Sequence, residues 1–505
     1  MVEIPTLDPS EAPRARRWDA LILGSGIAAL VAAARIGAAG QRVLIVEEEA
    51  RTKLPVAARE PFFLAGLRDE GILDACLRTL GVPLIDRRRL ATERLAYQIV
   101  ADPYRLDIGQ PIVTAEELVT WGLAKPDEAQ SLVRHLVEAS EIERELLLTA
   151  RFVRVGRRVA GGRAGAAIGN HKRGLPGDVS SARGGLRRIL DAQIRSLSNV
   201  GRRVPSPEAQ ARLLGLGLSG GVGFSGEPPW LVDLLRKRVT SLYGDFRTLS
   251  SDFEMVSVSG QPGIRVTRSG EIWLGRALVL AAPLFALRES LGVDPMHPAP
   301  DFLASSTDRR YRAVFLYRVP VAVLPEGMSA RFIMPAANAQ LVADAQPVAD
   351  AQPVADAQPV ADAHLVADAA DSEGSDVTVT AFPSQTHSGH VDLVARVMVS
   401  AADSGELPGL LPELRRSIAS RLEALMPFCG DRLLSIEMRP PGWDSDDGWL
   451  EDPRPGAGWP AEIDLRLSTR SRIYHLDRAA AGGLGLEGDL LLGWRGGDAI
   501  AGALA

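Results

Sequence analysis

The chain has 505 residues, of which 46% are hydrophobic and 24% charged, a length and balance typical of a globular protein with two domains or one large composite. Its 57 basic and 63 acidic residues leave a net charge of −6. This argues against nucleic acid as a main partner, because phosphate binding needs a surplus of Lys and Arg. The two cysteines, Cys76 and Cys429, are too few for a disulfide framework or a zinc site, so we expect a cytoplasmic protein.

The sequence predicts no membrane span. Its longest uncharged stretch, from Ala20 to Ala34, is shorter than the ~20 apolar residues that cross a bilayer. The N-terminal residues are polar and acidic before the first arginines, unlike the start of a signal peptide.

The first 50 residues predict a strand, a helix and a second strand. Residues Asp19 to Gly24 form an apolar run that ends in glycine, typical of a buried parallel strand. Residues 27–39 are rich in alanine and predict a helix that ends at Gly40. Residues 41–47 predict the second strand. This order indicates an α/β fold.

Apolar periodicity predicts further helices and strands along the chain. Helices are expected over 61–80, in two segments of 114–150 around Pro126, and over 186–200, 205–214, 231–243 and 410–425. Strands are expected over 253–258, 263–267, 271–282, 311–324, 377–382 and 392–399. The Gly- and Arg-rich residues 156–185 predict a loop.

Residues 339–368 consist of five consecutive hexads, AQLVAD, three copies of AQPVAD, and AHLVAD. One interpretation is a recognition arm built on polyproline-like turns. The interpretation that we favour is a disordered insert in a surface loop, because the segment is anionic, lacks Lys and Arg, and has few large apolar residues.

The motif that carries most chemistry is Gly24-Ser25-Gly26-Ile27-Ala28-Ala29, between the first strand and the first helix. Glycine at the first position permits the tight turn, glycine at the third lets the backbone approach a pyrophosphate, and alanine at the sixth allows close helix–sheet packing. The helix N-terminus offers N–H groups to phosphate. Glu47 ends the second strand, where a carboxylate accepts hydrogen bonds from ribose hydroxyls. The set predicts a dinucleotide site; the alternative is a small-residue helix packed tightly on a sheet.

A second match, Gly215-Leu-Gly-Leu-Ser-Gly220, follows no convincing strand and has further glycines behind it. We interpret it as a flexible loop beside the site rather than a second nucleotide motif. No fingerprint for NAD(P)H is found. The residues also indicate no metal site, and they assign no catalytic base.

The opening unit resembles the FAD domain of the phytoene desaturase and flavin amine oxidase group. Residues 244–258 resemble the strand of that group in which an apolar residue, here Phe253, contacts adenine through its backbone. Residues 271–283 resemble the strand that returns beneath the cofactor. Residues 483–495 are similar to the C-terminal glycine-rich segment that closes over the flavin and leads into the last helix, which implies Asp489 at the flavin end.

The chain departs from the group after Glu47. Where the group usually has a Gly-Gly-Arg stretch, this sequence reads Glu47-Glu-Glu-Ala-Arg-Thr-Lys-Leu-Pro55. Arg51 or Lys53 could neutralise the diphosphate there.

The resemblance implies an α/β fold in which a discontinuous, Rossmann-like FAD-binding domain (1–60, 225–290 and 476–505) is interleaved with an α+β substrate-binding domain (61–224 and 291–475). The expected cofactor is FAD. The residues expected to bind it are Gly24, Ser25, Gly26, Ile27, Ala28, Ala29, Glu47, Glu48, Phe253 and Asp489.

The function implied is an FAD-dependent oxidoreductase, a dehydrogenase, desaturase or oxidase that acts on an apolar organic substrate or an amine. The cofactor carries the redox chemistry while the protein orients the substrate and excludes water. Expected partners are that small molecule, an electron acceptor (oxygen, quinone or a carrier) and the surface of a membrane. Two alternatives stay open: a binding protein that resembles Rab GDP-dissociation inhibitors, and a flavin-dependent isomerase.

Overall fold

The computed structural model describes residues 4–11, 14–48, 54–67, 71–101, 104–149, 153–155, 184–198, 207–224, 231–249, 253–281, 310–336, 375–400, 407–436, 442–444, 463–467, 472–476, 481 and 484–505. The hexad repeat, Arg51, Lys53 and all but the last two residues of the expected loop at 156–185 lie outside them. Among the described residues, no helix is long and apolar enough to cross a membrane.

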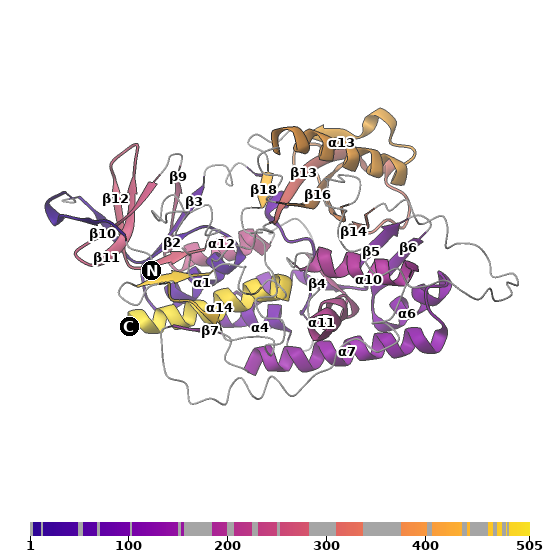
Figure 1. Ribbon diagram of the computed structural model, residues 1–505, viewed down its shortest axis with the longest axis horizontal. Helices are drawn as coiled ribbons and strands as arrows, with labels where there is room; N and C mark the ends of the chain where they lie inside the picture. The colour runs from indigo at the N-terminus through magenta and orange to yellow at the C-terminus, as the bar shows by residue number, and fades with distance from the viewer. Residues whose placement is uncertain are drawn as a thin grey trace, which may run out of the picture.

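The first sheet has eight strands, and its centre is parallel in the order β20-β12-β2-β3-β9, with β10, β11 and β1 continuing beyond β12. These strands are β1 (Thr6–Leu7), β2 (Arg16–Leu23), β3 (Val43–Glu48), β9 (Asp245–Leu249), β10 (Phe253–Val258), β11 (Gln261–Val266), β12 (Ile272–Leu280) and β20 (Ile473–His475). The sheet therefore joins the start of the chain, its middle and a segment near its end (Figure 1).

Both faces of this sheet are covered. In β2, Ala20 and Ile22 pack on the helices, while Leu21 and Leu23 pack on the opposite face with residues of β10 and β11, as alternation along a strand requires. The helices on the first face are α1 (Ile27–Ala38), α4 (Ile72–Thr79), α12 (Leu231–Ser241) and α14 (Gly485–Leu504). The parallel sheet confirms the expected α/β class with a Rossmann-like core.

The second sheet runs in the order β17-β13-β16-β15-β14-β5-β6, and β18 also pairs with β13. Its strands are β5 (Leu95–Ala101), β6 (Tyr104–Gly109), β13 (Arg310–Pro320), β14 (Arg331–Met334), β15 (Val377–Pro383), β16 (His390–Ser400), β17 (Leu434–Ile436) and β18 (Gly442–Asp444). Helix α13 (Leu407–Leu425) covers one face, where Leu414 and Ile418 pack with Phe315 and Tyr317 (Figure 1).

The remaining helices gather beside the second sheet and below it in the view of Figure 1. They are α6 (Pro111–Thr120), α7 (Pro126–Thr149), α10 (Gly184–Leu197) and α11 (Pro207–Leu218). The shorter elements are α3 (Val56–Arg59), α5 (Leu84–Arg87), β4 (Leu90–Glu93), β7 (Val153–Arg154), β8 (Gly221–Phe224) and β19 (Ile463–Asp464). The expected helices and strands are confirmed within a few residues, apart from the helix over 61–80 and the single strand over 244–258. The latter is divided into β9, which pairs with β3, and β10, which pairs with β11. The division into two domains stays a prediction.

The helix expected over 61–80 is wrong in its first half, since only Ile72–Thr79 is helical. Residues 61–67 lie in no helix or strand: Phe63 packs in the core that includes α7 and α11, while Leu64 packs in the core that includes α1. The Leu64 carbonyl accepts a hydrogen bond from the Val222 N–H, and Gly66 turns the chain with a φ of +78°.

The interpretation of residues 215–220 as a flexible loop is also wrong for residues 215–218. Gly215 and Gly217 lie in α11, and the following residues lead into β8. A Cβ on Gly215 would lie 2.4 Å from the Leu136 carbonyl oxygen, and one on Gly217 would lie 3.0 Å from the Tyr97 hydroxyl. These glycines therefore let α11 pack closely on α7 and β5.

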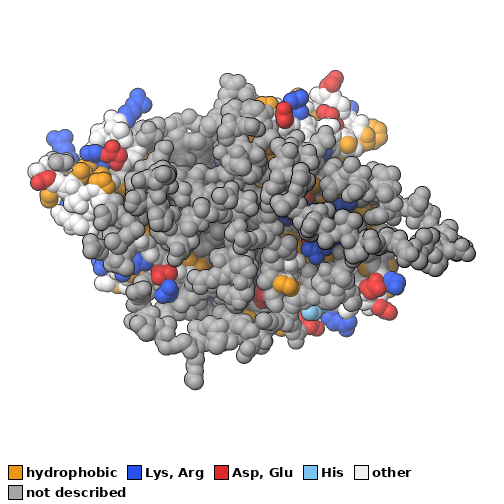
Figure 2. All heavy atoms as spheres, in the orientation of Figure 1, with side chains coloured by type: hydrophobic (Ala, Val, Ile, Leu, Met, Phe, Trp, Pro, Cys, Tyr) orange, Lys and Arg blue, Asp and Glu red, His pale blue; other side chains and the backbone are white. Residues whose placement is uncertain are grey.

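Charges of both signs are mixed on the described part of the surface. Figure 2 shows Lys, Arg, Asp and Glu side chains next to one another at the end formed by β10–β12 and around α13. Two ion pairs, Arg265 with Glu254 and Arg16 with Glu271, lie at the first of these places. This mixing accords with the small net charge.

Candidate functional site

The nucleotide motif lies at the point where the strand order of the first sheet reverses. From β2 the chain passes through α1 to β3 on one side, while β12 flanks β2 on the other. Ligands of open α/β sheets bind outside the carboxyl ends of the strands at such a point. Gly24 follows β2 with a φ of +111°, and its N–H donates to the Val46 carbonyl oxygen over 2.9 Å. A side chain at this position would strain the turn.

The first turn of α1 points its N–H groups toward this edge. Gly26 is the N-cap, and no side chain of the described residues caps the turn. Ser25, Ala28 and Ala29 are buried, so the turn and the start of α1 pack closely against the rest of the protein. Such a helix N-terminus suits a phosphate, because its N–H groups and dipole favour negative charge.

Glu47 lies at the carboxyl end of β3 and is 2% exposed. Its Oε1 accepts a hydrogen bond from Arg236 of α12, whose guanidinium also lies 4.3 Å from the Phe246 ring centroid. Sequence reasoning missed Arg236. A carboxylate has room for further hydrogen bonds, so the pair with Arg236 orients Glu47 and leaves it able to accept from a ribose hydroxyl.

The other expected cofactor residues lie further apart. Glu48 ends β3 opposite Leu249. Phe253 begins β10, opposite Val266, and is half-buried. Asp489 is 2% exposed and lies in the second turn of α14. The expectation that residues 483–495 lead into the last helix is therefore wrong, because the helix already begins at Gly485.

Helix α14 connects the nucleotide motif with a second region. A Cβ on Gly493 would lie 2.5 Å from the Ala28 carbonyl oxygen, and one on Gly497 would lie 2.9 Å from the Ala32 Cα. The later glycine of α14 contacts the later residue of α1, so the two helices run in the same direction. Helix α14 therefore begins about seven residues, or roughly 10 Å, before the start of α1. Its first turns extend past the Gly24 turn.

A pocket lies at this extended end of α14. Its walls come from residues 61–63 and 65, the end of α10, Leu216 of α11, the start of α14, and Arg312 and Arg396 of the second sheet. The chain thus places an apolar pocket with few polar groups beyond the nucleotide motif, which is the usual composition of a small-molecule site. Sequence reasoning missed this pocket, although Arg396 stands out as a charge within the otherwise apolar residues 393–399 of β16.

One buried carboxyl group, that of Glu487, lines the pocket, and another belongs to Glu60, which precedes the lining residue Pro61. Arg212 of α11 is buried and donates to Glu487 of α14 over 2.7 Å, and its Nε lies 3.4 Å from a carboxylate oxygen of Glu143. Burial raises the pKa of Glu487, although Arg212 opposes this. Burial also raises the pKa of Glu60 to about 8, against hydrogen bonds from the N–H groups of Val232 and Leu231.

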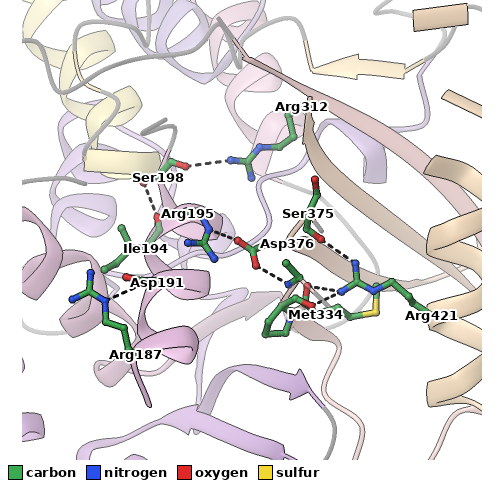
Figure 3. A network of polar contacts seen from close by, with 12 residues as sticks. Arg187, Asp191, Ile194, Arg195, Ser198, Arg312, Met334, Ser375, Asp376 and Arg421 are labelled. Atoms are coloured by element: carbon green, nitrogen blue, oxygen red, sulfur yellow. Dashed lines mark hydrogen bonds and ion pairs between the residues drawn. The ribbon is translucent and has the colours of Figure 1, made fainter. Parts of the chain in front are cut away.

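A polar network fixes the end of α10 against the second sheet (Figure 3). Arg195 of α10 pairs with Asp376, which also accepts a hydrogen bond from the Ala336 N–H over 2.9 Å. Arg312 extends from β13 to the Ser198 carbonyl oxygen at 3.4 Å. Since residues 196 and 197 line the pocket, this network holds one of its walls.

No protein-family model matches the chain, and no curated protein matches its sequence. Solved structures are similar over most of its length. Cyclohexylamine oxidase from Brevibacterium oxydans has 13% identity and a TM-score of 0.49, with 96% of this chain and 99% of that chain covered. An oxidoreductase from Methanosarcina mazei has 12% identity and a TM-score of 0.49, with 92% and 99% covered.

A geranylgeranyl bacteriochlorophyll reductase-like protein from Thermoplasma acidophilum has 10% identity and a TM-score of 0.42, with 97% of this chain and 79% of that chain covered. One of these three structures, cyclohexylamine oxidase, is named as an amine oxidase. With TM-scores below 0.5, these likenesses carry no argument about function, which rests on the residues of this chain.

Proposed function

We propose that this protein is an FAD-dependent oxidoreductase that acts on a small organic molecule. The observation that carries the proposal is the arrangement at one edge of the first sheet. The Gly24 turn, the start of α1 and the Glu47 carboxylate lie where the strand order of the sheet reverses. The pocket lies at the start of α14, beyond this point. An extended dinucleotide suits this layout because one end can occupy the motif while the other approaches the pocket.

In this proposal the backbone of residues 24–27 binds the diphosphate, and Glu47, oriented by Arg236, accepts hydrogen bonds from the adenosine ribose. Phe253, Glu48 and Asp489 stay proposals as further cofactor residues, with Asp489 toward the flavin. Bound there, FAD would supply the acceptor for two electrons from the substrate, which a second acceptor such as oxygen or a quinone then removes. The protein contributes orientation and exclusion of water by the apolar walls of the pocket.

The first experiment is an absorbance spectrum of the purified protein, followed by release and identification of any yellow chromophore. The proposal expects bound FAD, or uptake of added FAD, and bleaching of the flavin by a substrate without oxygen. A colourless protein that takes up no FAD would contradict it and favour the binding protein. A flavin whose reaction leaves the product at the oxidation level of the substrate would favour the isomerase.

The assignment of Glu47 is tested with Glu47→Gln, which keeps the shape and removes the charge. We expect FAD affinity to fall about tenfold or more, because hydrogen bonds to a charged acceptor contribute about 1.5–3 kcal/mol. Arg236→Met removes the partner of Glu47 and tests whether this ion pair only stabilises the fold. Glu254→Gln removes one partner of an exposed ion pair on β10 and is the control. Unchanged FAD affinity in Glu47→Gln would contradict the assignment.

A further inference from the structure

Glu60 connects the pocket with helix α12. The residue is 4% exposed, and its carboxyl group accepts hydrogen bonds from the N–H groups of Leu231 at 3.0 Å and Val232 at 2.9 Å, across 171 and 172 residues. Its backbone carbonyl oxygen accepts a hydrogen bond from Arg396 of β16 over 2.6 Å, and the next residue, Pro61, lines the pocket. One residue therefore joins a wall of the pocket to the first turn of α12.

This contact supplies what the local sequence of α12 lacks. The first N–H groups of a helix have no partner within the helix, and a Ser, Thr, Asp or Asn directly before the helix usually accepts from one of them. The three residues before α12 are Pro228, Pro229 and Trp230, whose side chains contain no hydrogen-bond acceptor. Both oxygens of the Glu60 carboxyl group take that role from a distant part of the chain.

A buried carboxyl group is a costly cap. Burial raises the pKa of Glu60 to about 8, and Asp233 adds to the rise, while the N–H groups of Val232 and Leu231 and the charge of Arg396 oppose it. A polar side chain of the local sequence could cap α12 without burying a carboxyl group. The use of Glu60 therefore points to a role beyond capping, because proteins depart from the simplest local solution chiefly at functional sites.

Helix α12 also carries the cation that orients the ribose acid. Arg236 follows Leu231 by five residues, about 7.5 Å along the helix axis. Its guanidinium group pairs with Glu47 and lies 4.3 Å from the Phe246 ring centroid. Apolar side chains of α12 pack in the same core as α1 (Figure 1). This packing holds one face of α12, whereas the hydrogen bonds to Glu60 hold its first turn. A displacement of that turn would move Arg236 relative to Glu47.

We propose that Glu60 is a positioning residue of the cofactor site: it fixes the start of α12 and, through Arg236, the direction in which the Glu47 carboxylate faces the ribose. The inference rests on the proposed function for the binding of FAD at Glu47. Glu60 acts through α12 and needs no contact with the cofactor itself.

The test is a double-mutant cycle on FAD affinity, measured by titration of the full-length protein with FAD after any bound flavin has been removed. Glu60→Gln keeps the size of the side chain and replaces one acceptor oxygen with an NH2 group. We expect it to weaken FAD binding by about three- to tenfold, the effect of one lost hydrogen bond. In the Arg236→Met protein the same substitution should change FAD affinity by less than about twofold, because the connection to Glu47 is already broken.

The cycle distinguishes positioning from a purely structural role. If Glu60 only stabilised the fold, the losses of FAD affinity in Glu60→Gln and Arg236→Met would add in the double variant. Additive losses would therefore overturn the proposal, and so would an unchanged FAD affinity in Glu60→Gln alone. Glu60→Asp keeps the charge on a shorter side chain and should weaken FAD binding about threefold. It replaces Glu60→Gln in the same cycle if that variant does not fold.

Glu117→Gln is the matched control. Glu117 of α6 also accepts from a backbone N–H, that of Asp107 at 3.3 Å, and from the Trp121 Nε1 at 3.1 Å, but α6 packs on α7 and β6. We expect its FAD affinity to be unchanged. A loss equal to that of Glu60→Gln would overturn the assignment to the contact with α12.

The unsubstituted protein separates this inference from the proposed function. Uptake of FAD with no effect of Glu60→Gln would refute only the role of Glu60. A protein that takes up no FAD would refute the proposed function and this role together.

Discussion

Two contacts of α14 differ in kind, although its C-terminal half also carries the partly exposed ion pair of Asp498 with Arg35 and its N-terminal half the closely packed Gly485 and Gly488. Toward its C-terminal end, Gly493 and Gly497 lie against the backbone of α1, with no room for a side chain. Toward its N-terminal end, Glu487 is held by the buried Arg212 of α11. The first contact joins small residues by shape, whereas the second joins charges in an environment where an unpaired charge is costly.

This difference has a consequence for function. The glycine contact fixes α14 beside the nucleotide motif, and the ion pair fixes the helix start that lines the pocket. Added volume at a close-packed contact destabilises the fold, and so does the loss of one partner of a buried ion pair. The glycine contact and the Arg212–Glu487 ion pair should therefore respond to different substitutions.

The largest effect is expected at the ion pair. Arg212→Met removes the buried cation that pairs with both Glu487 and Glu143, which should lower the free energy of unfolding by about 3–5 kcal/mol. Urea denaturation of the variant measures this. Lys125→Met, at the exposed pair with Glu128, is the control and should change stability by less than about 1 kcal/mol. Equal losses in the two variants would contradict a buried ionic cross-link.

The glycine contact is expected to give the next largest effect. Gly493→Leu places atoms within 2.7 Å of the Val31 Cβ and should cost about 2–3 kcal/mol through overpacking. The same helix provides the control: Gly502 has nothing within 4 Å of an added Cβ. Gly502→Ala should stabilise the helix by about 0.5–1 kcal/mol. Denaturation midpoints in urea measure both, and a stable Gly493→Leu would show that α14 can shift away from α1.

The pocket end should also respond to pH. The Glu60 carboxyl ionises near its ordinary pKa of 4.5 in the unfolded chain and near 8 in the folded protein. Between these values the folded state keeps a proton that the unfolded state has lost, so stability falls as pH rises, by up to about 1.4 kcal/mol per pH unit.

Glu60→Gln should flatten this slope between pH 5 and 8, within the window set by the same pKa values. Urea denaturation at several pH values measures it. Glu487 contributes in the same direction because burial raises its pKa too, so part of the slope should remain. A slope equal to that of the unsubstituted protein would refute the role of Glu60.

The smallest effect is expected away from both ends of α14. Deletion of residues 339–368 should change the free energy of unfolding by about 1 kcal/mol or less, because loop length enters closure entropy only as a logarithm. The deletion spares the hydrogen bond from the Ala336 N–H to Asp376. Thermal unfolding and flavin content measure the result, and a large loss of either would show that the repeat packs on the fold.

The nucleotide motif could be predicted because its residues act over short sequence distances. An apolar run, a glycine turn and an alanine-rich segment predict β2 and α1 without knowledge of their neighbours. The same local reasoning failed at residues 61–67 and 215–218. At the first, the neighbouring side chains of Phe63 and Leu64 pack into two different hydrophobic cores. At the second, glycines that resemble a loop permit close contact between helices.

The sequence by itself determined the α/β class, the position of the Gly24 turn and the acid at the end of β3, because these depend on patterns within about 30 residues. Only the tertiary structure decided that Arg236 orients Glu47, that Arg212 holds Glu487 across 275 residues, and that Arg312 and Arg396 meet in one pocket. The physical reason is that buried charges are placed by the sheet register and helix packing that bring distant segments together, and no local periodicity records those contacts.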